Sequence, residues 1–198
     1  LLCSPHNPTG TVHTAAELTA VAELCAANGV QLVVDEIHAW LVDPGTDFVP
    51  VLSVPTAQRA MVVVSAGKSW NLAAFKAGLY IAGTQAARVL NTLPPLAAHS
   101  TGHLGAIAHA AALRHGQEWV DQACVEIAAN KRLLSDLLHA LLPGARYRAQ
   151  PGTYLAWVDC SRLGLDDPYR HFLDAGRVAF SPGRVFSPAH KQWVRINL

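Results

Sequence analysis

The sequence predicts an α/β fold, in which a mainly parallel sheet with helices on both faces is followed by a smaller C-terminal α+β unit. The first observation behind this prediction is a helix pattern at residues 14–29 between near-continuous apolar runs of strand length. Such runs are typical of parallel strands buried on both faces. The second is a change, from Tyr147 on, to short strands separated by turns. The third is composition: 15% of the residues are charged, against about 25% in an ordinary soluble domain, so we expect much of the chain to be interior.

The first helix has the clearest signals. Thr14 and Glu17 form a T-x-x-E capping box, in which the two residues satisfy each other's backbone groups at the helix start. Asn28 and Gly29 provide a C-terminal stop. The apolar residues between these signals keep helical spacing: Leu18, Val21, Ala22, Leu24 and Cys25.

The remaining elements follow from apolar periodicity and turn residues. We expect strands at 30–36 and 61–65, an antiparallel or edge strand at 79–83, a helix at 84–93, a helical region at 104–142 broken near Gly116, and short strands at 153–159, 177–181 and 193–197. The domain prediction is that residues 1–120 are part of a large domain, residues 121–142 a long linking helix, and residues 143–198 part of a small domain.

Charge, hydropathy and cysteine usage exclude several classes of partner. The net charge is +1 and the Lys and Arg residues are scattered, so we expect neither nucleic acid nor a membrane surface as a partner. The sequence contains no uninterrupted apolar window of about 18 residues, so it does not predict a transmembrane helix. The four cysteines contain no CxxC pair, which favours reduced core residues in a cytoplasmic protein.

The two ends of the chain suggest a piece of a longer protein. The sequence starts without Met inside the apolar stretch LLCSP, and it stops at WVRINL, a strand pattern with no closing turn. We therefore expect a fragment, in which no signal peptide can be judged.

Two predicted strands end in charged residues. QLVVDE delivers Asp35 and MVVVSAGK delivers Lys68. Ligands of open α/β sheets bind beyond the carboxyl ends of the parallel strands, so the two side chains suggest one site. Each residue taken alone also has a purely structural explanation: Asp35 could cap a following helix, and Lys68 could simply be solvated.

Three other kinds of site fit less well. The GKS at 67–69 lacks the glycine that a P-loop needs five residues earlier, where Val62 stands. His99 and His103 have i,i+4 spacing but no acidic or cysteine companion, so we expect no metal. There is no G-x-S-x-G turn for an α/β-hydrolase nucleophile.

A lysine beside an acid at strand ends fits a different chemistry. Desolvation near a hydrophobic strand end favours a neutral, nucleophilic amine, and such an amine bonds covalently to carbonyl groups. Pyridoxal 5'-phosphate (PLP) is an aldehyde cofactor whose enzymes pair this lysine with an Asp on the pyridinium nitrogen. Lys68 and Asp35 suit these two roles.

The order of four motifs makes the interpretation specific. SPHNPTG at 4–10, DEIHAW at 35–40, SAGKSWNLAAFKAG at 65–78 and WVRINL at 193–198 resemble the signature of fold-type I PLP enzymes of the class I/II aminotransferase superfamily. The DEIH wording, HGQEWVDQ from His115 and GTYLAWVD from Gly152 resemble the cystathionine β-lyase branch, the bacterial C–S lyases. The resemblance implies the PLP-transferase type I large domain and part of its small domain.

The resemblance implies roles around the cofactor ring. Lys68 would bind the cofactor covalently and later move the substrate's Cα proton. Asp35 would keep the pyridine nitrogen protonated, and Asn7 would hydrogen-bond the phenolic oxygen and border the substrate. His38 stands where many aminotransferases have a tyrosine that touches the same oxygen. A tight Asn-Pro turn and a packed core histidine are the structural alternatives for the last two.

The resemblance also implies groups for the phosphate and the substrate. Ser65 and Lys76 match phosphate-binding positions, although many relatives have arginine at the second. Arg195 matches the arginine that grips the substrate α-carboxylate, with a surface arginine as the alternative. Trp70, Trp119, Tyr154 and Trp157 are candidates for pocket walls.

The implied function is PLP-dependent cleavage of cystathionine or cysteine S-conjugates, small amino-acid substrates, to a thiol, pyruvate and ammonia. The first alternative is a class I/II aminotransferase, and the second is a non-catalytic regulatory module on the same fold. The resemblance also implies a homodimer. Relatives have a preceding segment with a phosphate loop and an aromatic that stacks on the ring, so we expect the 198-residue chain alone to be weakly active or inactive.

Overall fold

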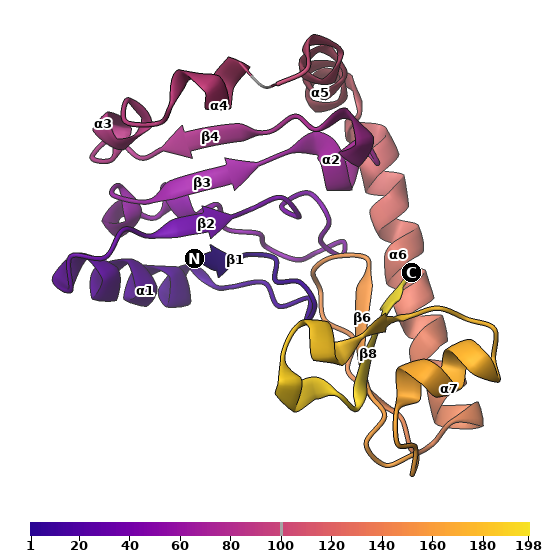
Figure 1. The fold of residues 1–198 in the computed structure, drawn as a ribbon. Helices are drawn as coiled ribbons and strands as arrows, with labels where there is room; N and C mark the ends of the chain where they lie inside the picture. The colour runs from indigo at the N-terminus through magenta and orange to yellow at the C-terminus, as the bar shows by residue number, and fades with distance from the viewer. Residues whose placement is uncertain (100) are drawn as a thin grey trace.

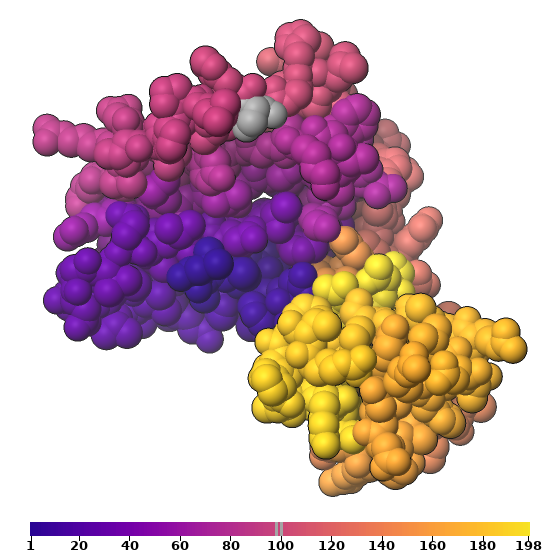
Figure 2. Space-filling view, in the orientation of Figure 1, coloured from indigo at the N-terminus to yellow at the C-terminus, as the bar shows by residue number. Residues whose placement is uncertain are grey.

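The computed structural model describes residues 1–99 and 101–198, and it contains two four-stranded sheets. The first sheet and its helices form one lobe, and the second sheet forms a smaller lobe near the C-terminal end (Figure 1). The space-filling view shows the smaller lobe as a separate body against the larger one (Figure 2). This architecture confirms the α/β prediction with a smaller C-terminal unit.

The first sheet has the strand order β1-β2-β3-β4. Its strands are β1 (Leu2–Cys3), β2 (Val33–Asp35), β3 (Met61–Val64) and β4 (Leu79–Ala82). β1, β2 and β3 pair in parallel, and β4 pairs antiparallel with β3. The prediction of an antiparallel or edge strand at 79–83 is therefore confirmed, whereas the strand expected over 30–36 is shorter.

Helix α1 (Ala15–Ala27) begins at the predicted cap. Thr14 accepts a hydrogen bond from the Glu17 amide, and the Glu17 carboxylate accepts one from the Thr14 amide. Asn28 is the C-cap, and Gly29 follows with φ of +64°. Leu24, which keeps the helical spacing, is nevertheless 65% exposed because it lies off the core-facing side of the helix.

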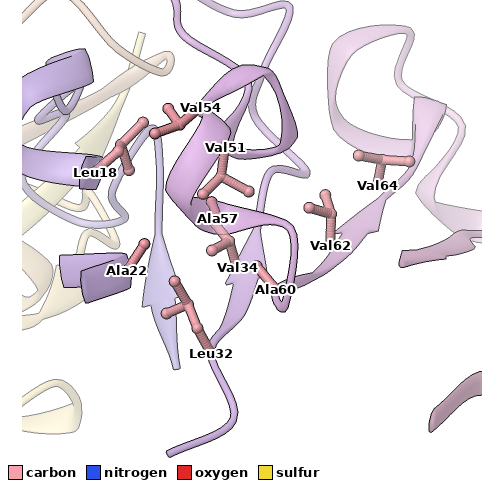
Figure 3. Close-up of a cluster of buried hydrophobic side chains, with 10 residues drawn as sticks. All are labelled: Leu18, Ala22, Leu32, Val34, Val51, Val54, Ala57, Ala60, Val62 and Val64. Atoms are coloured by element: carbon pink, nitrogen blue, oxygen red, sulfur yellow. The ribbon is translucent and has the colours of Figure 1, made fainter. Parts of the chain in front are cut away.

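The main core lies between α1, the sheet and two short 3-10 turns, η1 (Val51–Ser53) and η2 (Pro55–Ala57) (Figure 3). It contains only aliphatic side chains: Leu18, Ala22, Leu32, Val34, Val51, Val54, Ala57, Ala60, Val62 and Val64. Burying one such valine or leucine contributes roughly 1.5–3 kcal/mol. This core holds β2 and β3 side by side, with their carboxyl ends at the same edge.

The helices that follow β3 are α2 (Ala66–Ser69), η3 (Ala73–Phe75), α3 (Ala87–Leu90), α4 (Pro95–His99), α5 (His103–His115) and α6 (Gln117–Leu141). The helix expected over 84–93 is reduced to α3. The break near Gly116 is confirmed: Trp70 Nε1 donates to the Gly116 carbonyl at 2.8 Å, and a Cβ at Gly116 would meet that indole at 2.3 Å. Close contact with Trp70 therefore requires a glycine between α5 and α6.

The second sheet is antiparallel, with strand order β5-β6-β8-β7. Its elements are β5 (Arg146–Tyr147), β6 (Leu155–Asp159), α7 (Pro168–Asp174), β7 (Ser181–Pro182), η4 (Gly183–Val185), η5 (Pro188–His190) and β8 (Trp193–Asn197). The strand expected over 177–181 is wrong except at Ser181, because Arg177 adopts a left-handed conformation, with φ of +56°, that interrupts extended backbone.

Helix α6 connects the two lobes (Figure 1). Val120 and Cys124 pack against Leu41 of the first lobe, whereas Leu134 and Leu138 pack against the core of the second sheet. The domain boundaries at residues 120 and 142 stay a prediction. In the part of the chain that the structure describes, no helix is both long and apolar enough to cross a bilayer. All four cysteines are free, two of them buried and two half-buried.

Candidate active site

Asp35 and Lys68 lie on neighbouring segments at the carboxyl edge of the first sheet. Asp35 ends β2 and is level with Val63 of the parallel strand β3. Lys68 follows β3 within α2. The Asp35 side chain accepts a hydrogen bond from the Ile37 amide at 2.9 Å through one oxygen, which orients the carboxylate and leaves its second oxygen for another donor.

The Lys68 ammonium is exposed and takes part in no hydrogen bond or ion pair with the described residues. The apolar burial that the sequence predicts around Lys68 is therefore absent among the described residues. Lys68 borders a cavity of about 400 Å³. The cavity wall also contains Leu41, Trp119, Ile127, Tyr154 and Asn197, so Trp119 and Tyr154 line a pocket as expected, whereas Trp70 instead packs on Trp40.

His38 is the buried polar centre of the site. Its ring is 5.8 Å from the Tyr154 ring in an edge arrangement, and its Nδ1 is buried without a hydrogen-bond partner in the described chain. Burial, reinforced by the positive charges of Lys68 and Arg195 and opposed by Asp35, lowers the pKa of His38 to about 4. The imidazole is therefore neutral near pH 7 and can accept or donate one hydrogen bond.

Arg195 joins the two lobes. Its Nη1 donates to Asn7 Oδ1 at 3.0 Å, across 188 residues of sequence, and its Nη2 donates to Ser181 Oγ at 3.0 Å. The guanidinium also lies 5.1 Å from the centre of the Phe186 ring. Its Nε is buried without an acceptor among the described residues, so one N–H of the guanidinium is left unsatisfied there.

Within the described chain, Ser65 and Lys76 form no hydrogen bond or ion pair with the other candidate residues. Ser65 caps α2: its hydroxyl donates to the Ala77 carbonyl at 2.7 Å and accepts from the Gly67 amide at 2.9 Å. Lys76 is exposed, with φ of +52°. Both therefore lie on the stretch around Lys68, but the Ser65 hydroxyl hydrogen is already used within the protein.

Sequence reasoning missed two residues that hold Arg195. Ser181 lies opposite Arg195 in the β7–β8 pair, and Phe186 follows η4. A register prediction for β7 and β8 would have found Ser181. No sequence signal marks Phe186, because an isolated phenylalanine in a loop is equally consistent with core packing.

Comparison with known families gives a match over the whole chain. The family described as aminotransferase class I and II matches residues 1–198. A Mycobacterium leprae protein named "Putative cystathionine beta-lyase" is 46% identical, over 100% of this chain and 52% of its own length. Cystathionine beta-lyase PatB of Bacillus subtilis is 29% identical, over 100% of this chain and 52% of that protein. Aminotransferases also occur among the relatives.

A solved structure agrees with these relatives. The PLP-bound C-S lyase of Staphylococcus hominis, in complex with L-cycloserine, superposes with a TM-score of 0.89 at 28% identity, over 100% of this chain and 49% of that one. The chain thus spans about half the length of the curated relatives it matches. From its motifs, its fold and the match over residues 1–198, this chain belongs to the aminotransferase class I and II family.

Proposed function

We propose that this chain carries the lysine-bearing half of a PLP-dependent C–S β-lyase, which cleaves cystathionine or cysteine S-conjugates to a thiol, pyruvate and ammonia. One observation carries the proposal: an unpartnered lysine amine and an oriented carboxylate, Lys68 and Asp35, lie on adjacent parallel segments at one edge of the sheet. The names of the C–S lyase relatives support this choice of reaction.

The residues present fit the reactive part of PLP. The Lys68 amine is available for the aldehyde, and the second Asp35 oxygen is available for a pyridinium N–H. Because Asn7 Oδ1 accepts from Arg195, the Asn7 amide directs its NH₂ donors elsewhere and can serve the phenolic oxygen. The unpartnered His38 Nδ1 would complete that side of the ring.

The phosphate end fits less completely. Ser65 already donates its hydroxyl hydrogen to the Ala77 carbonyl, so it can donate to a phosphate only after that bond breaks. Lys76 supplies a positive charge, but an ammonium binds phosphate less directionally than the planar guanidinium of arginine. We therefore expect the described chain to hold the phosphate weakly without further donors.

The cofactor, when bound, supplies an electron sink for the bond-breaking chemistry. The protein residues orient the substrate and move protons. The Arg195 guanidinium would bind the substrate α-carboxylate, a contact that is strong because both partners are charged. This grip would direct the Cα–H bond toward the Lys68 amine, which removes the proton, and orientation of this kind contributes several kcal/mol to rate enhancement.

The rival function is transamination, which the aminotransferase relatives support. The deciding experiment uses the full-length natural protein loaded with PLP and supplied with cystathionine in the absence of any keto acid. The lyase proposal predicts pyruvate release, which Lys68→Ala abolishes and Lys191→Ala, at an exposed lysine of the second lobe, preserves. Turnover that requires an added keto acid would instead show the aminotransferase, and no turnover under either condition would favour the non-catalytic module.

The proposal includes a cytoplasmic homodimer. The four free cysteines support a reducing compartment, since disulfides form mainly in oxidising ones. Gel filtration of the full-length protein with light scattering tests the dimer.

A further inference from the structure

Lys131, in the middle of α6, is a buried charged residue outside the candidate active site. It is 1% exposed, and its Nζ lies 2.6 Å from Asp43 Oδ1 and 2.9 Å from the Gln150 carbonyl oxygen. A buried ammonium is costly unless it is paired and hydrogen-bonded. The two acceptors come from different segments, so the ammonium ties α6 to the loop after β2 and to the connection between β5 and β6.

These two segments meet at the junction between the lobes. The Asp43 amide donates to the Pro151 carbonyl at 2.8 Å, and the Thr153 amide donates to the Leu41 carbonyl at 2.7 Å. The Gly152 amide donates to the Gly10 carbonyl at 2.8 Å. Residues 41–43, 150–153 and Gly10 therefore form a junction of three segments, and Lys131 is bonded to two of them.

Both halves of the candidate site are connected directly to this junction. On one side, residues 41–43 follow His38, and Gly10 follows Asn7 in the same turn. On the other side, Thr153 precedes Tyr154 and β6, in which Trp157 is the register partner of Arg195. A shift of residues 150–153 against residues 41–43 would therefore move Arg195 relative to Lys68.

We propose that Lys131 is a positioning residue, which fixes the second sheet against the first so that Arg195 lies at the correct distance from Lys68 to bind the substrate carboxylate. This inference rests on the proposed function, because the distance matters only if both groups act on one substrate. The ion pair to Asp43 and the hydrogen bond to the Gln150 carbonyl are directional. Together they fix α6, the loop after β2 and the β5–β6 connection in one arrangement, whereas apolar contacts are non-directional.

The first test needs no cofactor. Hydrogen exchange of the full-length protein without added PLP is compared between the wild type and Lys131→Met, which keeps the length of the side chain but removes its charge. The amides of Asp43 and Thr153 should exchange about tenfold faster in the variant. Arg132→Met, at an exposed neighbour, should leave both rates unchanged. Wild-type exchange rates in Lys131→Met would overturn the proposal.

The second test uses the full-length protein loaded with PLP. Lys131→Met should raise the KM for the amino-acid substrate about tenfold, with kcat and the visible absorption band of the bound cofactor nearly unchanged. Arg132→Met should keep the wild-type KM. If Lys131→Met does not fold, Asp43→Asn, which retains an oxygen acceptor, should give a smaller KM increase in the same direction.

A double-mutant cycle separates positioning from general destabilisation. If Lys131 acts through Arg195, Lys131→Met should raise KM much less in an Arg195→Lys background than in the wild type. A positioning role would be contradicted if Lys131→Met raised KM by the same factor in both backgrounds. A loss of kcat without a change in KM would contradict it as well. Absence of a cofactor absorption band in the wild type would instead refute the proposed function. The exchange experiment would still show whether Lys131 stabilises the junction.

Discussion

At the scale of single residues, the site is marked by buried polar atoms that lack partners in the described chain. His38 Nδ1 and Arg195 Nε are both buried and unsatisfied, although buried polar groups in folded proteins are nearly always hydrogen-bonded. The positive charges of Lys68 and Arg195 both help to lower the pKa of His38. A ligand with acceptor and donor groups between them would satisfy these atoms.

The buried His38 makes stability depend on pH. Its pKa in the folded state is lowered to about 4 from an ordinary value of 6.5, so the unfolded state binds more protons between these values and the free energy of unfolding falls as the pH drops. When the pH falls from about 7 to about 4.5, protonation of His38 in the unfolded state should lower the free energy of unfolding by on the order of 2 kcal/mol.

Urea unfolding at both pH values measures this cost. His38→Gln should lose less stability on acidification than the wild type, by that amount, whereas His139→Gln, at an exposed position of α6, should behave as the wild type. Equal acid sensitivity of His38→Gln and the wild type would show that the imidazole is not held neutral.

The sequence predicted residue types better than residue environments. Asp35 and Lys68 were found because charge at the end of an apolar strand is conspicuous, and the structure places them at one sheet edge. The sequence did not predict that Lys68 is exposed, because exposure depends on how distant segments pack. It also did not predict that the Ser65 hydroxyl donates to the Ala77 carbonyl, because this bond depends on the conformation of the loop between them. Their assignment to a cofactor stays a prediction.

At the scale of elements, α1 depends on one apolar face. Leu18 is 1% exposed within the main core, whereas Leu24, on the same helix, is 65% exposed. Leu18→Ala should therefore lower the free energy of unfolding by about 3 kcal/mol through lost burial and a residual cavity. Leu24→Ala should change it by less than about 0.5 kcal/mol, and chemical denaturation compares the two. Similar losses in both variants would mean that α1 packs with another face.

Local signals predicted the ends of α1 well and the strand lengths poorly. A capping box and an Asn-Gly stop act through contacts three or four residues apart, so they are readable from sequence. Strand ends depend on the partner strand: in the described sheet Val30 and Gln31 precede β2 without a ladder partner, whereas the Leu32 carbonyl still accepts from the Met61 amide. For the same reason β7 is limited to Ser181–Pro182.

At the scale of the whole molecule, the two lobes meet through close backbone contacts. A Cβ added at Gly152 would lie 2.6 Å from the Pro5 Cβ and 2.7 Å from the Gly10 carbonyl oxygen, neither of which is a flexible side-chain end. Gly152→Ala should therefore separate the segments and lower the free energy of unfolding by about 1–3 kcal/mol.

Gly102→Ala is the matched control, because a Cβ there meets nothing within 4 Å. Its cost should stay below about 1 kcal/mol, the usual effect at a helix N-cap. Thermal unfolding of both variants provides the comparison. If Gly152→Ala is as stable as Gly102→Ala, the junction accommodates the added Cβ without a loss in the free energy of unfolding.

Contacts between the lobes were beyond prediction from the sequence. The bond between Asn7 and Arg195 spans 188 residues, and Lys131 reaches Asp43 across 88. Neither pair has a periodic pattern or a motif that links its members. The sequence identified Asn7 and Arg195 only through family resemblance, and it gave no sign that Lys131 is buried.

Covalent attachment of the cofactor to Lys68 is tested most directly by borohydride reduction of the full-length PLP-loaded protein, followed by peptide mapping with mass spectrometry. We predict that the reduced pyridoxyl group is found on the peptide that contains Lys68. Its recovery on Lys76, Lys131 or Lys191, or on none of the four lysines of this chain, would contradict the proposed site.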